Sequence, residues 1–555
     1  MRFLSPFLSV AALCALSLSP ASAAPAAPDA GLAYGVLVKL KSSDATTLVG
    51  REAPLAQRER LAAAFRGKSF SLGEVSPLDA EAHVVRWARP LSRVEADRLV
   101  QELRQDPNVE WAAPNVRERR LQAAPNDPYF NSRQWWLSTA PDIGSRGVPN
   151  IARSWGVPAP GAATVAVLDT GLVRNHEDLL GTRFDTGYDL VSNGDGLAGD
   201  GDGRDADFND PGDGVVADQC ADGSAPEDSS WHGTKIAGII GANSDNGVGV
   251  AGANWGARVV SVRIAGKCGA LVSDIIAGMR WAAGLKVDNL PLNPHPARII
   301  NLSFGGSETD CEPYRLTIDD LHRAGAVIIA AGGNEDGRVS RPARCAGVLA
   351  VGAVNRDGFK ATYANLGPQI DITTVGGDSK NSGRLGPTVG DDGLYTASKD
   401  EPSETDGGDP KYGFVFGTSF STPVVAGVAS RMLAVNPQLT IDQLVHGLQS
   451  TSRPHVTSGV AELQQCSVDA PQGRCYCTTA TCGAGLLDAE AAMAYAKAPA
   501  ASPPTFYTPG SGDGDGGGGG DDDGGGGGAL DARWLLGLAA IAWLARFGRG
   551  LRRRT

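Results

Sequence analysis

Short apolar runs alternate with longer apolar stretches through the middle of the chain. The runs at 164–168, 299–304 and 326–331 are rich in β-branched residues, which is typical of buried strands in a parallel sheet. The stretches that follow His232 and Ser419 are built from apolar and small residues, which predicts buried helices. We therefore predict a three-layer α/β fold over 124–497, with a mostly parallel sheet between helices.

A different pattern precedes this region, between residues 30 and 123. Strand-like runs at 34–40 and 83–87 alternate with helical spacing at 55–65 and 92–103. This βαβ-like order predicts a small α+β domain that is separate from the larger α/β region.

Both ends of the chain differ in composition from the middle. Residues 1–23 combine Arg2, an apolar stretch and a small-residue cleavage site, which is the pattern of a secretory signal peptide. Residues 498–530 are rich in Pro, Gly and Asp and predict a flexible, solvated linker. Residues 531–555 hold an apolar segment that is short for a permanent membrane span of about 20 residues, and the arginines after it should stay cytoplasmic.

The charge balance and the cysteines narrow the classes of function. The 555 residues carry 62 acidic and 50 basic side chains, which argues against nucleic acid as a partner. Cys14 lies in the leader, and the remaining eight of the nine cysteines are an even number behind an export signal, which predicts disulfides. The sequence alone leaves their connectivity open. A zinc site is the rival interpretation for the four cysteines between 466 and 482, although they lack a clear pair of Cys-x-x-Cys motifs.

Acidic residues also cluster between 193 and 213, where they alternate with glycines. Oxygen-rich loops with flexible glycines suit calcium. A solvated acidic loop explains the same composition equally well.

Three short motifs carry the candidate chemistry, and they follow one another in the order Asp, His, Ser. They are Asp169-Thr170-Gly171, Trp231-His232-Gly233-Thr234 and Gly417-Thr418-Ser419-Phe420-Ser421-Thr422-Pro423. A serine hydroxyl is a poor nucleophile at neutral pH, so a histidine must take its proton and a carboxylate must hold that histidine in the right tautomer. Asp169 ends a predicted strand, where α/β sheets place ligands. Each motif alone is more often a turn or a helix cap, whereas all three in this order predict nucleophilic catalysis.

These motifs, and the sequence between them over roughly 125–495, closely resemble the subtilisin-like (S8) serine proteases. The resemblance implies a serine endopeptidase in which Ser419 attacks the peptide carbonyl, His232 moves the proton and Asp169 orients His232. The run 326–334 resembles the family's oxyanion segment, which implies that Asn334 donates to the oxyanion together with the Ser419 backbone N–H. Lys235 departs from the pattern, because many members carry a second histidine there.

The apolar run that ends at Ser303, Phe304 and Gly305 resembles the family segment that pairs with an extended peptide and walls the main specificity pocket. With Gly333, these are the predicted substrate-binding residues. Main-chain pairing accepts many peptide sequences, and glycine lets another backbone approach closely. Glu335 leads to the further hypothesis that the pocket rim is mildly acidic and favours a basic or polar side chain.

The resemblance also implies structural calcium and a disulfide pattern. Asp127 follows Asn126 as at the mature N-terminus of thermitase-type members, where the aspartate ligates calcium, and Asp178 matches a second ligand position. The loop 243–248 resembles a third contributor through Asn246, although its length is irregular. Calcium is expected to stabilise loops and not to catalyse. Related secreted members imply Cys220–Cys268 and Cys311–Cys345, which leaves four cysteines to pair among themselves: Cys466, Cys475, Cys477 and Cys482.

The flanking segments resemble processing elements of secreted proteases. Residues 30–123 resemble the family's inhibitory propeptide, with self-cleavage near 122–124, and an unrelated N-terminal domain is the alternative. The glycine-rich linker, apolar segment and terminal arginines resemble the GlyGly-CTERM sorting tail of Gram-negative secreted proteins. Such a tail contacts the inner membrane transiently and is removed by a rhomboid-type protease, and a plain membrane anchor is the alternative. We expect a secreted or cell-surface enzyme that acts on proteins or peptides.

Two other functions are compatible with parts of this pattern. A transpeptidase or cyclase on the same fold would need a modified leaving-group site, and the sequence shows none. A surface binding protein with a decayed site is the second alternative. It is disfavoured because all four predicted catalytic positions, Asp169, His232, Ser419 and Asn334, carry the residue that the chemistry needs.

Overall fold

The computed structural model describes the chain in twelve stretches: 32–41, 52–66, 74–78, 82–116, 124–138, 146–192, 196–221, 223–378, 393–399, 410–457, 463–469 and 473–510. The chain divides into two compact units, Met1–Leu121 and Gln122–Thr555. The predicted signal peptide (1–23), the linker beyond residue 510 and the apolar tail (531–555) lie outside the described residues. Within the twelve stretches, no helix is both long enough and apolar enough to cross a membrane.

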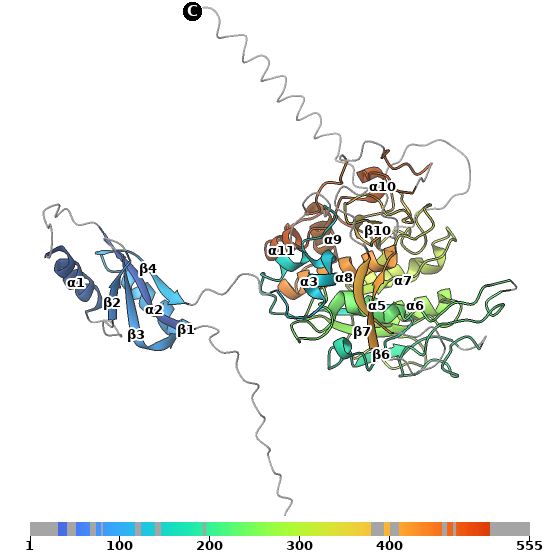
Figure 1. Ribbon diagram of the computed structural model, residues 1–555, viewed down its shortest axis with the longest axis horizontal. Helices are drawn as coiled ribbons and strands as arrows, with labels where there is room; N and C mark the ends of the chain where they lie inside the picture. Colours follow the sequence, from blue (N-terminus) through green and yellow to red (C-terminus); the bar gives the residue numbers. More distant parts are fainter. Residues whose placement is uncertain are drawn as a thin grey trace, which may run out of the picture. The chain divides into compact units, whose positions relative to one another are not determined.

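The first unit is an antiparallel sheet with two helices (Figure 1). Its strands lie in the order β2-β3-β1-β4, where β1 is Leu32–Leu40, β2 is Glu74–Pro77, β3 is Ala82–Ser92 and β4 is Val109–Val116. The helices are α1 (Glu52–Phe65) and α2 (Arg93–Arg104). The unit has the predicted α+β class and βαβ-like order, because each helix joins two parallel strands: β1 and β2 both run antiparallel to β3, and β3 and β4 both run antiparallel to β1. The antiparallel pairing of β2 with β3 joins these two βαβ units.

The second unit is built on a seven-stranded sheet in which every neighbouring pair is parallel. The strand order is β11-β10-β9-β8-β5-β7-β6. The predicted runs at 164–168, 299–304 and 326–331 correspond to its three adjacent strands β5, β8 and β9. The strands are β5 (Thr164–Asp169), β6 (Thr186–Asp189), β7 (Arg258–Arg263), β8 (Ile299–Leu302), β9 (Val327–Ala331), β10 (Val348–Val354) and β11 (Ile372–Val375), with a separate antiparallel pair formed by β12 (Leu394–Lys399) and β13 (Pro410–Val415).

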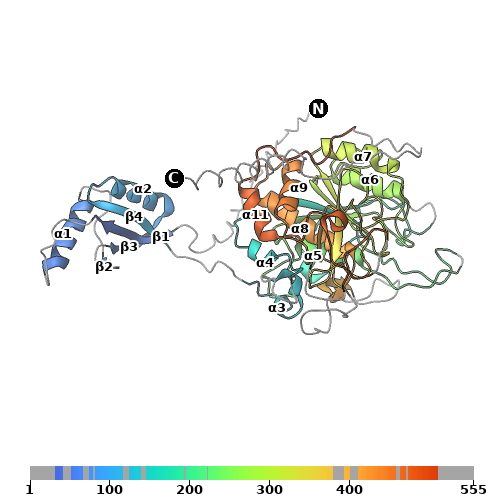
Figure 2. The ribbon, with the colours of Figure 1, turned by 90° about the horizontal axis from the view of Figure 1, so that it is seen from above.

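Helices cover both faces of this sheet, which gives the predicted three layers (Figures 1 and 2). Val165 and Val167 of β5 belong to the core under α5 and α8, whereas Ala166 and Leu168 belong to the core under α6 and α7. This alternation follows from the two-residue period of a strand. The first layer contains α5 (His232–Gly241), α8 (Thr418–Val435), α9 (Ile441–Ser450) and α11 (Ala489–Lys497), the second contains α6 (Val272–Ala282) and α7 (Glu312–Arg323), and α3 (Phe130–Arg133), α4 (Ile151–Ser154) and α10 (Thr479–Cys482) are short.

Four disulfides cross-link the second unit. Cys220–Cys268 and Cys311–Cys345 match the pairs that the family resemblance implies. The remaining four cysteines pair among themselves as Cys466–Cys475 and Cys477–Cys482. Three of their sulfur atoms lie within 4.8 Å of one another. Zinc is bound by thiolates, so sulfur atoms that are joined in disulfides argue against the zinc interpretation.

The first part of the predicted linker, residues 498–510, lies against helices α7 and α9. The Tyr507 hydroxyl donates to Asp319 Oδ1 at 2.7 Å, and the Phe506 N–H donates to Asp442 Oδ1 at 2.8 Å. His322 of α7 contacts the Tyr507 ring at 4.8 Å between ring centroids. The two aromatic residues therefore fix this stretch to the surface of the unit.

Candidate active site

The candidate catalytic residues come together at one edge of the parallel sheet. Asp169 is the last residue of β5, and Asn334 lies three residues beyond the end of β9. His232 is the first residue of α5, and Ser419 lies in the first turn of α8. The carboxyl ends of parallel strands share one edge, where α/β folds bind ligands. Residues that are up to 250 positions apart in the chain thus reach the same region.

Asp169 and His232 form a direct pair. His232 Nδ1 lies 2.8 Å from Asp169 Oδ1 and 2.9 Å from Oδ2. The Asp169 side chain is 1% exposed and that of His232 is 18% exposed, so the carboxylate is buried behind a partly open imidazole. The Thr170 N–H also donates to Asp169 Oδ1, at 2.8 Å. A carboxylate on Nδ1 fixes the tautomer in which Nε2 is free to accept a proton.

The residue after Ser419 packs against this pair. The ring of Phe420, the next residue, lies 5.2 Å from the His232 ring between centroids, and the Phe304 ring lies 5.6 Å from it. Ser419 Oγ donates to the Ser303 carbonyl at 3.1 Å, and Ser303 Oγ donates to the Ser419 carbonyl at 2.8 Å. These reciprocal bonds tie the first turn of α8 to the residue that follows β8.

Asn334 is oriented by the residue that precedes Ser419. Asn334 Oδ1 accepts from the Thr418 N–H and from Thr418 Oγ1, both at 2.9 Å. A backbone N–H can only donate, so the amide atom that faces it must be the oxygen. This leaves Asn334 Nδ2 as the atom that can donate to an oxyanion.

Gly333 and Glu335 shape the turn on either side of Asn334. Gly333 has φ 111°, a conformation that favours glycine, and a Cβ there would lie 2.1 Å from Asn365 Nδ2. Glu335 Oε2 accepts from the Asn334 N–H at 2.9 Å and from Asn365 Nδ2 at 2.6 Å. The Glu335 carboxylate is therefore bonded to its own turn and to Asn365, and its effect on substrate preference stays a prediction.

Asp210 extends the Asp–His pair, and the sequence reasoning missed it. Thr170 Oγ1 donates to Asp210 Oδ2 at 2.6 Å and accepts from the Gly233 N–H at 3.0 Å. Asp210 is 1% exposed, its Oδ1 accepts from the Gly212 N–H at 2.9 Å, and burial raises its pKa to about 7. The signal that points to it is the Thr170 hydroxyl, because a buried hydroxyl needs a partner.

A cavity of about 350 Å³ opens next to Asp210. Lys399, in its wall, places Nζ 4.4 Å from the centroid of the Trp231 ring, and Trp231 directly precedes His232. Lys235, which stands where many subtilisin-like proteases have histidine, is half-buried, and burial lowers its pKa while Asp213 and Asp210 raise it. The cavity is lined by Val173, Arg174, Asn175, Asp207, Asn209, Asp210 and Lys399.

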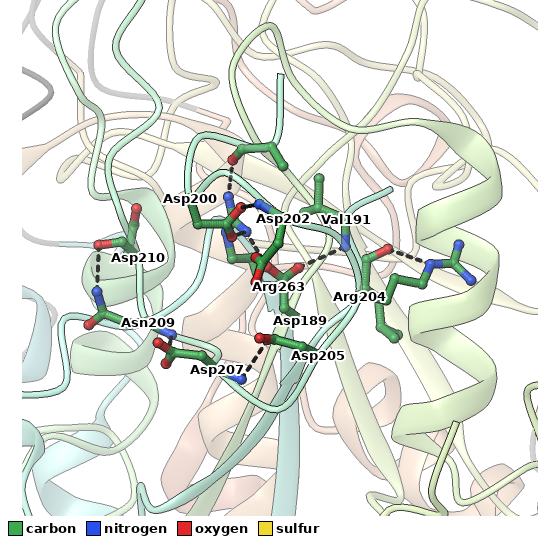
Figure 3. A network of polar contacts seen from close by, with 12 residues as sticks. Asp189, Val191, Asp200, Asp202, Arg204, Asp205, Asp207, Asn209, Asp210 and Arg263 are labelled. Carbon is green, nitrogen blue, oxygen red and sulfur yellow. Dashed lines mark hydrogen bonds and ion pairs between the residues drawn. The ribbon is translucent and has the colours of Figure 1, made fainter. Parts of the chain in front are cut away.

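Most carboxylates of the described acidic loop are bonded to the protein (Figure 3). The buried guanidinium of Arg263 binds Asp200 and also Asp189 of β6. Burial raises the pKa of Asp189 to about 7 although Arg263 opposes this shift. Asp205 and Asp207 each accept from the backbone N–H two residues further on. An arginine thus takes the place that a cation would fill between Asp189 and Asp200, and calcium in this loop stays a prediction.

The three predicted calcium ligands lie together. Asn246 Nδ2 donates to Asp178 Oδ1 at 3.0 Å, and the Asp245 N–H donates to Asp127 Oδ2 at 2.8 Å. The side chains of Asp127 and Asp178 are buried, with residue exposures of 3% and 0%. Burial raises the pKa of Asp178 to about 6, and the charge of Asp127 raises it further. Burial also raises the pKa of Asp127.

This cluster fits a hard cation. Asp127 Oδ1 is buried and has no hydrogen-bond partner among the described residues, and two buried carboxyls close together favour a positive ion between them. Asn246 faces Asp178 through its nitrogen, so the amide must turn over to present its oxygen to a metal. The two aspartates therefore fit a calcium site with oxygen ligands, whereas Asn246 Oδ1 accepts from the Val248 N–H at 2.9 Å and would have to leave this bond to join it.

A buried Asp–His pair, a serine at a helix start and an asparagine on a parallel sheet are the side chains that a serine hydrolase site needs. Residues 161–474 match the subtilase family, Peptidase_S8, and the chain belongs to this family. It is 34% identical over 435 residues to an extracellular protease of Xanthomonas campestris, covering 77% of this chain and 66% of the relative. It is 36% identical over 350 residues to an extracellular basic protease of Dichelobacter nodosus, covering 61% and 53%.

A solved structure supports the same assignment. A protease from Pseudoalteromonas arctica superposes with a TM-score of 0.57 at 36% identity, covering 67% of this chain and 100% of that chain. The chain spans about two thirds of the Xanthomonas relative and about half of the Dichelobacter relative.

Proposed function

We propose that the protein is a secreted serine endopeptidase that hydrolyses peptide bonds through Asp169, His232 and Ser419. The observation that carries this proposal is the buried Asp169–His232 pair, with the imidazole packed against the residue next to Ser419. The names of two relatives as extracellular proteases support both the reaction and the secretion.

The geometry supports an acyl-enzyme mechanism. The Ser419 hydroxyl rotates from the Ser303 carbonyl to His232 Nε2, which takes its proton while Oγ attacks the peptide carbonyl. Asp169 holds the resulting imidazolium, and His232 then gives the proton to the leaving amine. Water, activated by His232, hydrolyses the acyl-enzyme in the second half of the reaction.

The oxyanion of the tetrahedral intermediate would accept from Asn334 Nδ2 and from the Ser419 N–H. Thr418 fixes the Asn334 amide before the substrate arrives, so little reorganisation is needed when charge develops. A donor of this kind contributes about 2.7–4 kcal/mol of transition-state stabilisation, the range known for the oxyanion asparagine of subtilisin.

The peptide substrate would bind as an added strand along Ser303, Phe304 and Gly305, opposite Gly333. Phe304 is half-buried against the His232 ring, and Gly305 is exposed directly after it. Backbone pairing at this position supports broad sequence acceptance. Proteins and peptides are therefore the proposed partners.

Calcium and processing complete the proposal. Calcium held by Asp127, Asp178 and Asn246 would supply charge that offsets two buried carboxylates and so stabilise the loops around them. The 30–123 unit would act as the inhibitory propeptide, removed by self-cleavage near 122–124, and the 531–555 tail would serve in sorting before its removal by a rhomboid-type protease.

Labelling with a fluorophosphonate tests the site directly. Purified wild-type protein should label and hydrolyse a peptide amide, and Ser419→Ala should do neither while keeping its thermal unfolding temperature. Mass spectrometry of the products separates hydrolysis from transpeptidation, because only the latter joins an added amine to the peptide. Labelling that survives in Ser419→Ala would place the nucleophile elsewhere.

A further inference from the structure

Asp336, two residues after Asn334, is held by a buried lysine. It has φ 51°, a left-handed conformation that is uncommon for residues other than glycine. Lys360 Nζ lies 2.6 Å from Asp336 Oδ1, and the lysine side chain is 1% exposed. The Asp336 N–H donates to the Tyr363 carbonyl at 2.7 Å. The turn that carries Asn334 therefore depends on contacts with the segment 360–363.

Two further contacts of Lys360 come from Gly473 and Cys475, at the end of the loop that the Cys466–Cys475 disulfide closes. Lys360 Nζ donates to the Gly473 carbonyl at 2.9 Å, and the Gly473 N–H donates to Asp336 Oδ2 at 2.7 Å. The Lys360 N–H donates to the Cys475 carbonyl at 3.0 Å. The third Nζ–H group donates to the Ala361 carbonyl at 3.2 Å, so each of the three donors of the ammonium has an acceptor.

A second ion pair, between Arg474 and Asp378, connects the same loop to the turn that precedes Ser419. Arg474 Nη2 lies 3.0 Å from Asp378 Oδ2, with side-chain exposures of 6% and 0%. Asp378 accepts from the Thr362 N–H at 3.0 Å and from Thr362 Oγ1 at 2.9 Å. The hydroxyl of Tyr363 then accepts from the Gly417 N–H at 2.9 Å, two residues before Ser419.

We propose that Lys360 and Arg474 are positioning residues of the oxyanion hole. They bind Gly473 and Arg474 to the segment 360–363 and to Asp378. This segment in turn bonds to Asp336, in the turn that carries Asn334, and to Gly417, in the turn before Ser419. It thereby fixes the position of Asn334 relative to Ser419. A hydrogen-bond donor stabilises the oxyanion most when its position and direction are fixed before the charge develops. The surrounding residues that contact the donor fix this geometry. This inference rests on the proposed function, because it assigns a supporting role to residues outside the catalytic set.

Steady-state kinetics of Lys360→Met in two backgrounds test this proposal, using the full-length gene product and a peptide amide substrate. In the wild-type background we expect kcat to fall about tenfold with little change in KM, a smaller effect than the loss of about 10²–10³-fold for removing the donor itself. In the Asn334→Ala background we expect a loss of less than about twofold, because the group that Lys360 positions is gone. An equal loss in both backgrounds would overturn the proposal.

Arg298→Met is the matched control. Arg298 is also a half-buried cation that donates to backbone carbonyls, at Gly325, Pro437 and Leu439, and these carbonyls lie outside the segment 360–363. It should lower the unfolding temperature without lowering kcat. If it lowers kcat as much as Lys360→Met does, the effect reports general destabilisation and the proposal is wrong.

A double variant distinguishes a loss of positioning from a loss of folding. Lys360→Met with Asp336→Asn removes both charges, so no unpaired carboxylate is left in the partly exposed Asp336 turn, and it should show the same kcat loss as Lys360→Met. If this double variant fails to accumulate as folded protein, the pair belongs to fold stability and the proposal falls. If the wild-type protein shows no hydrolysis that depends on Ser419, the proposed function itself is refuted.

Discussion

The substitution Asp210→Asn should change how the stability of the protein depends on pH. The Asp210 carboxyl is buried beside the Asp169–Thr170 turn and accepts from Thr170 Oγ1 and the Gly212 N–H. Burial raises its pKa from 3.8 to about 7, the charge of Asp213 raises it further, and the two hydrogen bonds act in the opposite direction. The folded protein therefore holds this proton over a range in which the unfolded chain has lost it.

The sign and the size of the effect follow from this difference. Below about pH 4 both states are protonated, and the contribution of the group to stability is fully present. Between 3.8 and about 7 unfolding releases the Asp210 proton, so the free energy of unfolding falls by about 1.4 kcal/mol per pH unit. The total loss is roughly 4 kcal/mol, and it is complete once the pH exceeds the folded-state pKa.

Urea unfolding at pH 5, 6, 7 and 8 measures this slope. The parent should be Ser419→Ala, which under the proposed function would not digest itself, at a fixed calcium concentration, with and without Asp210→Asn. Asparagine keeps only one of the two accepted hydrogen bonds, which lowers stability by about 1–3 kcal/mol at every pH. The readout is therefore the slope, which should be flatter in the variant between pH 5 and 7. Parallel curves over this range would refute the reasoning.

Three further predictions concern the oxyanion hole, the calcium cluster and a disulfide. Asn334→Ala should lower kcat by about 10²–10³-fold with KM nearly unchanged, in steady-state kinetics on a peptide amide, and a change confined to KM would contradict the assigned role. Calcium should raise the unfolding temperature relative to EDTA above pH 6 and lose this effect as the pH falls through the Asp178 pKa of about 6, because protons compete for the carboxylate. Asp178→Asn should abolish the calcium-dependent shift, and a full shift in the variant would exclude this residue as a ligand. Replacing both cysteines of Cys311–Cys345, which are separated by 34 residues, should lower the free energy of unfolding by about 4 kcal/mol in urea unfolding, and unchanged stability would contradict this.

The sequence was sufficient for features whose signal is local. The strands β5, β8 and β9 are buried on both faces, so each appears as a continuous apolar run. His232 and Ser419 stand at the start of helices whose apolar composition marks them clearly. The order of the three motifs then identified the family, which the comparison with known proteins confirmed.

Features that depend on contacts between distant residues could not be read in this way. Asp210 lies 40 residues from Thr170, and Lys360 lies 113 residues from Gly473, so no periodicity connects them. The short strand β2 (Glu74–Pro77) pairs with β3, but it has no apolar run in the sequence that could mark it. The bonds within the acidic loop depend on Arg263, which is buried in β7 and outside the loop.

The docking of residues 498–510 determines what a protease can remove from this chain. Peptide bonds are cut where the backbone can enter another enzyme's cleft as an extended strand. Tyr507 and Gly510 are both bonded to Asp319, and Phe506 is bonded to Asp442, so the backbone up to this point is withheld from such a cleft. Under the proposed function, trimming from the C-terminal side should therefore not pass Gly510, which would leave the enzyme with a defined end.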